Sequence, residues 1–202
     1  MRVTTPADLP ATLPAPGRYA LTTCRYAINQ AHDQIPWDGR FRASVVLFRM
    51  VDGEPAVRTD LLTEDDHQAM YIGDMLAGYI RRLANPPAPG THCGVAVIYE
   101  AAECDPDVEL AATSAEELSA QLLDLIAAGR ARQFRAAFGT AEPGWRFAVH
   151  RARHADEPTM TVWQPGEGFP PADDETAPPA ELVPALTELN LALLRADERG
   201  QR

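Results

Sequence analysis

Hydrophobic positions are most strongly patterned between residues 41 and 83, where two strands and a helix are predicted. Residues 44–48 form a short apolar run rich in β-branched side chains, which is typical of a strand covered on both faces. Asp52-Gly53 readily adopts the positive φ angles of a tight hairpin turn, so a second strand should return through residues 56–59. Pro55 has no N–H to donate to a ladder, which indicates that this strand begins at an edge or a bulge.

A capped helix should follow this hairpin. Thr63 can accept a backbone N–H in the first turn, and the three carboxylates after it favour the positive end of the helix dipole. Asn85 and the two prolines behind it mark the other end. The apolar side chains recur every three or four residues, which places them on one stripe that faces the hairpin. These side chains are Ala69, Ile72, Leu76, Tyr79 and Leu83.

Four further segments are predicted to be strands. Residues 94–99 form a second apolar run, and they should lie in the same sheet as the first strand, parallel or antiparallel to it. Residues 108–111 are expected to form a short edge strand. Residues 145–149 alternate between apolar and polar side chains, which indicates a half-buried strand, and residues 159–163 are its expected antiparallel neighbour.

Two further regions of the sequence carry helix signals. Thr113 with Glu116, and Ser114 with Glu117, both have the spacing of a capping box, so a second helix is predicted to start there and to end near Gly129. Near the start of the chain, residues 19–23 alternate as in a strand, and a helical turn is predicted after them.

Proline and acidic residues divide the chain into four predicted parts. Residues 1–17 contain four prolines and few bulky apolar groups, which indicates a flexible tail. Residues 18–163 should form a single domain. Residues 164–180 are rich in proline and carboxylates, so they are predicted to be a linker, and residues 181–202 a leucine-rich C-terminal helix.

The predicted fold class is α+β: a mostly antiparallel or mixed β-sheet with two packed helices and a tethered C-terminal helix. The stripe of that last helix consists of leucines that must be buried somewhere, either on their own domain or on another chain. We therefore interpret these residues as a candidate binding surface for a partner or for self-association. The stripe comprises Leu182, Leu186, Leu189 and Leu193.

Composition narrows the possible functions. The chain has 202 residues, of which 46% are hydrophobic, so it can bury a substantial core. Its 29 carboxylates against 18 basic residues disfavour nucleic-acid binding, which depends on neutralising phosphates, although such a chain can also mimic nucleic acid. Every basic residue is an arginine, which excludes lysine Schiff bases and phosphate-loop lysines. This bias is typical of a high-GC coding sequence, and we expect a bacterium or its phage as the source.

Cysteine usage points to a reducing compartment, and hydropathy argues against a membrane-spanning segment. The three cysteines form no C-x-x-C pair and follow no apparent signal peptide, so a cytoplasmic location is expected. No apolar run approaches the ~20 residues that span a bilayer, so no membrane insertion is expected. We find no motif that calls for a cofactor, and none is predicted.

Aromatic and arginine side chains supply the remaining binding candidates. Trp37 and Arg40 lie in a turn-prone loop, and both residue types dominate interface energetics. Arg130, Arg132 and Arg135 form the only concentrated basic patch of the sequence, which could hold an anionic ligand or an acidic partner. Alternatively, these arginines complement the preceding helix dipole or pair with carboxylates of the same chain.

Two sets of residues could carry chemistry: a cysteine–histidine pair and a cluster of metal-ligand residues. Cys93 could act as a nucleophile with His92 or Cys24 nearby, but adjacent strand residues point to opposite faces, and a buried structural cysteine is the alternative.

The second set is a candidate metal site. His150, His154 and Asp156 carry suitable ligand atoms, and their spacing suits a metal only if the segment is helical. The strand pattern of residues 145–149 argues against a helix there.

Taken together, the sequence favours a non-catalytic protein–protein interaction or assembly function, because no pattern gathers polar side chains around a reacting atom. The alternatives are a small enzyme with a Cys/His site and an acidic nucleic-acid-mimic inhibitor.

Overall fold

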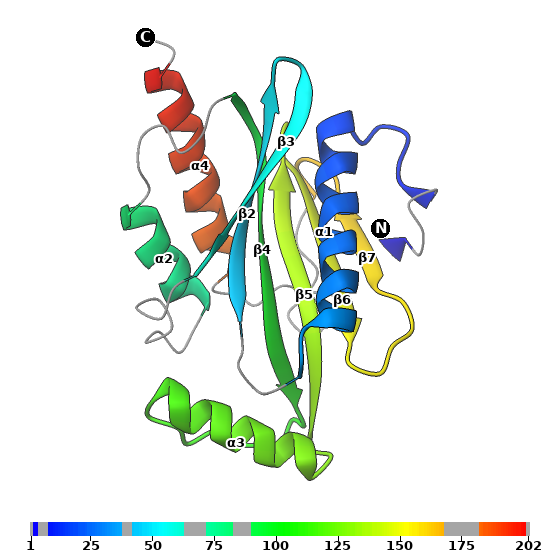
Figure 1. Ribbon diagram of the computed structural model, residues 1–202, viewed down its shortest axis with the longest axis vertical. Helices are drawn as coiled ribbons and strands as arrows, with labels where there is room; N and C mark the ends of the chain where they lie inside the picture. Colours follow the sequence, from blue (N-terminus) through cyan, green and yellow to red (C-terminus); the bar gives the residue numbers. More distant parts are fainter. Residues whose placement is uncertain are drawn as a thin grey trace.

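The structure of the chain is a computed structural model that describes residues 2–3, 8–37, 42–62, 72–82, 90–167 and 182–200 (Figure 1). The predicted helix ends at Thr63 and Asn85, and residues 168–180 of the predicted linker, lie outside the described residues. The described elements are β1 (Arg2–Val3), α1 (Ala15–Gln34), β2 (Ala43–Val51), β3 (Glu54–Leu61), α2 (Ile72–Arg82), β4 (Thr91–Cys104), α3 (Ala115–Ala127), β5 (Ala131–Ala141), β6 (Trp145–Ala152), β7 (Thr159–Trp163) and α4 (Leu182–Gly200).

The strands form one antiparallel sheet in the order β1-β7-β6-β5-β4-β2-β3. This confirms the predicted α+β class, and it shows that β2 and β4 are antiparallel. The predicted hairpin is also present, since Asp52 and Gly53 have φ angles of 51° and 83° between β2 and β3. β3 is the last strand of the sheet, so Pro55 lies in an edge strand, as its missing N–H predicts.

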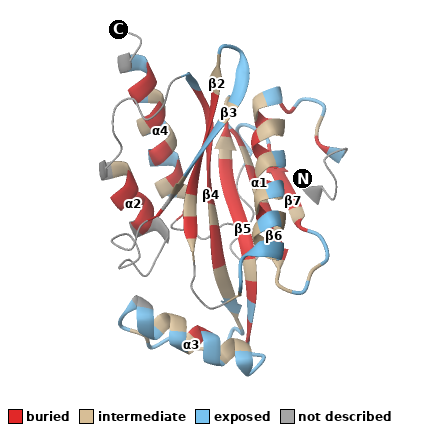
Figure 2. Ribbon diagram, viewed as in Figure 1, coloured by how far each residue is buried: buried red, intermediate tan, exposed pale blue. Residues whose placement is uncertain are grey.

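Helices cover both faces of this sheet, giving three layers (Figures 1 and 2). α1 packs on one face over β4, β5 and β6, and α4 packs on the other face beside α2. The buried residues accordingly form two clusters, one on each face of the sheet. α3 lies apart from both layers, across the far end of the long β4–β5 pair. Within the described residues, no helix is long and apolar enough to cross a membrane.

α1 replaces the strand predicted over residues 19–23, so that prediction is wrong. The helix begins at Ala15, and Pro16 lies in its first turn, where a missing N–H costs little. A strand-like alternation over five residues coincides here with a longer helical period that decides the structure. The buried residues of that helical face are Gly17, Ala20, Leu21, Cys24 and Ile28.

The described part of residues 1–17 is folded, which corrects the prediction of a flexible tail. Arg2–Val3 pairs with β7 at the edge of the sheet. Leu9 and Leu13 have exposed fractions of only 8% and 4%, and they join the core cluster beneath α1. The guanidinium of Arg18 donates to the carbonyl oxygen of Leu13 at 3.0 Å, which fastens this segment to the helix.

β5 lies between β4 and β6 although no strand is predicted for its residues. Four alanines and one glycine occupy the strand, and both residue types have low strand propensity. Gly139 shows why small residues are needed: a Cβ there would lie 2.4 Å from the ring of Phe147 and 2.8 Å from the Cβ of Ala96. Close packing against the neighbouring strands therefore decides the structure here.

Of the two predicted capping boxes of α3, the structure shows the one with Ser114 as the N-cap. The hydroxyl of Ser114 accepts the N–H of Glu117 at 3.2 Å, and the Glu117 carboxylate accepts the N–H of Thr113 at 2.9 Å. Beyond the helix, Gly129 has a φ of 73°, the left-handed conformation expected of its position. The edge strand predicted over residues 108–111 is absent, because that segment runs along α3 without strand pairing.

Candidate functional site

Trp37 lies at the carboxyl end of α1, in a cluster of basic side chains. The guanidinium carbon of Arg135 is 3.9 Å from the centroid of the Trp37 ring, and that of Arg153 is 5.9 Å away. The ring of His32 meets the same tryptophan edge-on at 5.6 Å. Two cation–π contacts on one half-buried ring indicate that Trp37 packs within its own chain. Arg40, its predicted neighbour in binding, lies outside the described residues.

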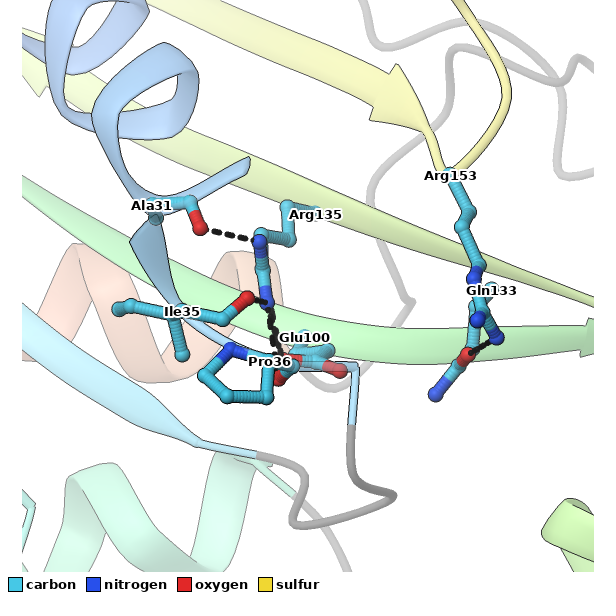
Figure 3. Close-up of polar contacts among 7 residues, drawn as sticks. All are labelled: Ala31, Ile35, Pro36, Glu100, Gln133, Arg135 and Arg153. Carbon is cyan, nitrogen blue, oxygen red and sulfur yellow. Dashed lines mark hydrogen bonds and ion pairs between the residues drawn. The ribbon is translucent and has the colours of Figure 1, made fainter. Parts of the chain in front are cut away.

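Arg135 is a buried structural residue (Figure 3). Its guanidinium donates to the carbonyl oxygens of Ala31, of Ile35 at 3.0 Å and of Pro36 at 3.4 Å, all at the end of α1. It also pairs with the carboxylate of Glu100 at 3.3 Å, and these two side chains are only 4% and 3% exposed. Arg135 thus completes the last helical turn and balances a buried charge, so its donors are used within the fold.

The predicted basic patch does not form as one surface, which corrects that prediction. Arg132 and Arg135 lie on β5 three positions apart, so they point to opposite faces of the sheet. Arg130 is exposed and pairs with Asp107 at 2.7 Å. Arg132 lies 3.9 Å from Glu103 with 83% of its side chain exposed. These arginines therefore follow the alternative reading, in which they pair with carboxylates of the same chain.

A polar network on the opposite face joins α4 to the sheet, and the sequence analysis did not find it. Arg49 and Asp197 form an ion pair at 2.6 Å, with side chains 4% and 8% exposed. The second oxygen of Asp197 accepts the backbone N–H of His92. His92 Nε2 donates to Asn190 at 2.7 Å, and Asn190 donates to Glu142 at 3.1 Å. The sequence holds one signal of this network: the polar residues Asn190 and Asp197 lie seven positions apart, on the helix face beside the leucine stripe.

His92 and Cys93 do not form a nucleophile–base pair. Cys93 belongs to the core cluster beneath α1, whereas the ring of His92 contacts α4 on the other face of the sheet. Burial raises the pKa of Cys93 to about 11, and burial raises the pKa of the Cys24 thiol further still. Burial also lowers the pKa of His92. Both thiols are therefore protonated at neutral pH, which favours the structural alternative for these cysteines.

The predicted metal ligands are not gathered around one point. His150 lies on β6 and its ring packs against Phe134, with ring centroids 4.6 Å apart and the ring planes 42° from parallel. His154 is exposed in the following turn. The backbone carbonyl of Asp156 accepts a hydrogen bond from Arg151 at 3.0 Å, which holds the turn in place. Throughout the described ranges, no three His, Cys, Asp or Glu side chains come together as a metal site.

The leucine stripe of α4 is buried in its own chain. Its four members each have an exposed fraction of 0%, and they belong to the core cluster that includes residues of α2 and the sheet. The surface that the sequence suggested for a partner is thus occupied by the sheet. These residues are Leu182, Leu186, Leu189 and Leu193.

α3 keeps much of its apolar surface in contact with solvent. Among the α3 side chains that the structure describes, only Leu122, at 8% exposure, is buried. Leu118, Leu125 and Ile126 are half-buried, and Leu123 is 40% exposed. Among the described elements, α3 packs chiefly against the ends of β4 and β5. The apolar side chains of α3 are therefore less covered than the leucine stripe of α4.

Comparisons with known proteins add no family to this picture. The sequence matches no protein-family model, and no curated protein or solved structure is significantly similar to the chain. The function must therefore be argued from the geometry of the fold.

Proposed function

We propose that this protein is non-catalytic and works by binding another protein through the apolar side chains of α3 that remain in contact with solvent, Leu118, Leu123, Leu125 and Ile126. The observation that carries the proposal is a contrast between two leucine-rich helices of the same chain. The leucine stripe of α4 is fully buried, whereas α3 buries one leucine and leaves Leu123 40% exposed. Burial of apolar surface drives most protein association, so the uncovered helix is the favourable binding element.

The charges around this face indicate the chemistry of the partner. Glu116, Glu117 and Asp124 are exposed on α3 beside the apolar side chains. A partner surface with an apolar centre and a basic rim would complement them, since unlike charges at a rim steer association and set its orientation. The net charge of −11 for the whole chain favours the same class of partner.

Catalysis by the Cys/His set is the weaker candidate. Cys93 is protonated and faces away from His92, and the ring of His92 is already bonded to Asn190.

The three cysteines are free thiols, which supports the cytoplasm as the proposed compartment.

A nucleic-acid mimic needs a continuous negative face. Several surface carboxylates are instead paired with arginines, including Asp107 with Arg130 and Glu157 with Arg25.

The proposal is tested with two matched substitutions, Leu123→Glu on α3 and Leu191→Glu on α4. Both leucines are exposed, at 40% and 45%, so each change should alter the free energy of unfolding by no more than about 0.5 kcal/mol. Quantitative co-purification from the cells that naturally produce the protein should recover one partner with the wild type and with Leu191→Glu. Leu123→Glu should reduce its recovery about tenfold or more, because a charge replaces an apolar contact.

Equal recovery of the same proteins by all three forms would contradict binding through α3. Loss of recovery with Leu191→Glu alone would instead assign the binding surface to α4.

A further inference from the structure

β3 lies at one edge of the sheet. The strand pairs with β2 on one side, and it is the last strand of the sheet. Most of its described side chains are exposed, including Val57 at 39% (Figure 2). Within the described residues, no other strand pairs with its outer side. An open edge of this length is a template for a further strand.

The register of the β2–β3 pair fixes which backbone groups face outward. The N–H of Leu62 donates to the carbonyl oxygen of Ala43 at 3.1 Å, so these opposite residues are a hydrogen-bonded pair. Hydrogen-bonded and non-hydrogen-bonded pairs alternate along an antiparallel ladder. Ser44 lies opposite Leu61, and every second residue of β3 therefore directs its N–H and C=O away from β2. These outward-facing residues are Pro55, Val57, Thr59 and Leu61.

Among the remaining residues of β3, Arg58 and Asp60 carry charges of opposite sign two positions apart. Arg58 and Asp60 lie on the same face of the strand, where their side chains form an ion pair at 2.8 Å. The side chains are 49% and 21% exposed, so both remain within reach of a strand added at the edge. Asp60 also accepts the hydroxyl of Tyr79 at 2.7 Å, which ties this end of β3 to α2.

We propose that β3 pairs with β3 of a second copy of this chain, antiparallel and with a two-fold axis at Thr59. In this register Thr59 lies opposite its own copy, and Val57 lies opposite Leu61 of the second copy. The three opposed pairs exchange two backbone hydrogen bonds each. Arg58 lies opposite Asp60 of the second copy, and the axis repeats this contact, so the strand is complementary to itself in charge.

Neighbouring two-fold registers lack this complementarity. An axis at Arg58 sets two arginines opposite each other, and an axis at Asp60 sets two aspartates opposite each other. An axis at Val57 sets Asp60 opposite Glu54 of the second copy. Like charges that face each other across a strand pair are destabilising, so charge selects the register centred on Thr59.

Pro55 excludes the register centred on Ala56. That register sets Pro55 opposite Val57 of the second copy, and each such pair then lacks one hydrogen bond because proline has no N–H. In the register centred on Thr59, Pro55 lies beyond the three bonded pairs. The proline therefore marks one end of the segment that can pair.

The test is a charge-reversal cycle followed by sedimentation velocity of the full chain over about 1 to 500 µM. The wild type should show a monomer–dimer equilibrium within this range. Arg58→Asp and Asp60→Arg should each weaken dimerisation about tenfold, since each sets two like-charge pairs across the axis. The double variant should return to within about threefold of the wild type, because it restores two unlike-charge pairs.

Thr59→Pro provides a second test that leaves the charges intact. Thr59 directs its N–H outward, so proline there removes hydrogen bonds of the dimer without removing one to β2, and the dimer should be lost while the far-UV circular dichroism is retained. Leu123→Glu should leave the equilibrium unchanged, which separates this edge from the α3 face. A wild type that stays monomeric throughout, or a dimer that is indifferent to the single reversals and to Thr59→Pro, would overturn the proposal.

Discussion

Arg135→Met should lower the free energy of unfolding by about 3–5 kcal/mol. The guanidinium is buried, and it is bonded at once to Glu100 on β4 and to carbonyl oxygens at the end of α1. Methionine fills much of the same volume but leaves the Glu100 carboxylate without its buried countercharge. Urea unfolding followed by circular dichroism at neutral pH measures the change.

The double variant Arg135→Met, Glu100→Leu is the matched control. It removes the uncompensated charge, so it should regain a large part of the lost stability. If Arg135 instead served a ligand, the single variant would lose less than about 1 kcal/mol of stability, and that result would contradict the structural role assigned to it here.

Leu189→Ala should cost about 2–5 kcal/mol in the free energy of unfolding. Leu189 lies on α4 with an exposed fraction of 0%, within the core cluster shared with α2 and the sheet. Removing its side chain opens a cavity at that contact. The same urea titration measures the loss, and a single cooperative transition is expected because α4 and the sheet share one core.

Leu191→Ala is the control on the same helix. Leu191 is 45% exposed, so its truncation should change the unfolding free energy by about 0.5 kcal/mol or less. Equal and small losses for the two variants would mean that α4 does not dock on its own sheet, and the leucine stripe would again become a candidate for binding a second chain.

Elements with local chemical signals were predicted correctly. Asp52-Gly53 specifies its hairpin through backbone conformation alone, and Ser114 with Glu117 specifies the start of α3 through hydrogen bonds within one turn. The alternation of residues 145–149 also predicts β6 correctly, because every second side chain of this strand is buried. Such signals depend only on neighbours in the sequence, so they can be recognised without the fold.

Elements that depend on distant contacts were missed or misassigned. β5 is a strand because Gly139 and its alanines fit closely against β4 and β6, and nothing in the local sequence announces those neighbours. The role of Arg135 follows from a countercharge 35 residues away and from the end of α1, 100 residues away. Arg132 and Arg135 are close in the sequence, but strand alternation places their side chains on opposite faces of the sheet.

The proposed binding surface lies on α3, whereas the sequence suggested the leucine stripe of α4, and this difference has a physical reason. Amphipathic patterning identifies a helix with an apolar stripe, but it does not say which surface covers that stripe. The stripe of α4 is covered by the sheet, whereas α3 lies across the end of β4 and β5 and leaves Leu123 40% exposed. Only the fold shows which of the two helices is covered by the sheet.

Site-specific photo-crosslinking in the cells that naturally produce the protein tests binding through α3 most directly. A photoreactive residue is placed at position 123 on α3 or, as the control, at position 191 on α4, where the native leucines are 40% and 45% exposed. We expect one discrete adduct of higher mass from position 123 and none from position 191. No adduct at position 123, or the same adducts from both positions, would contradict the account.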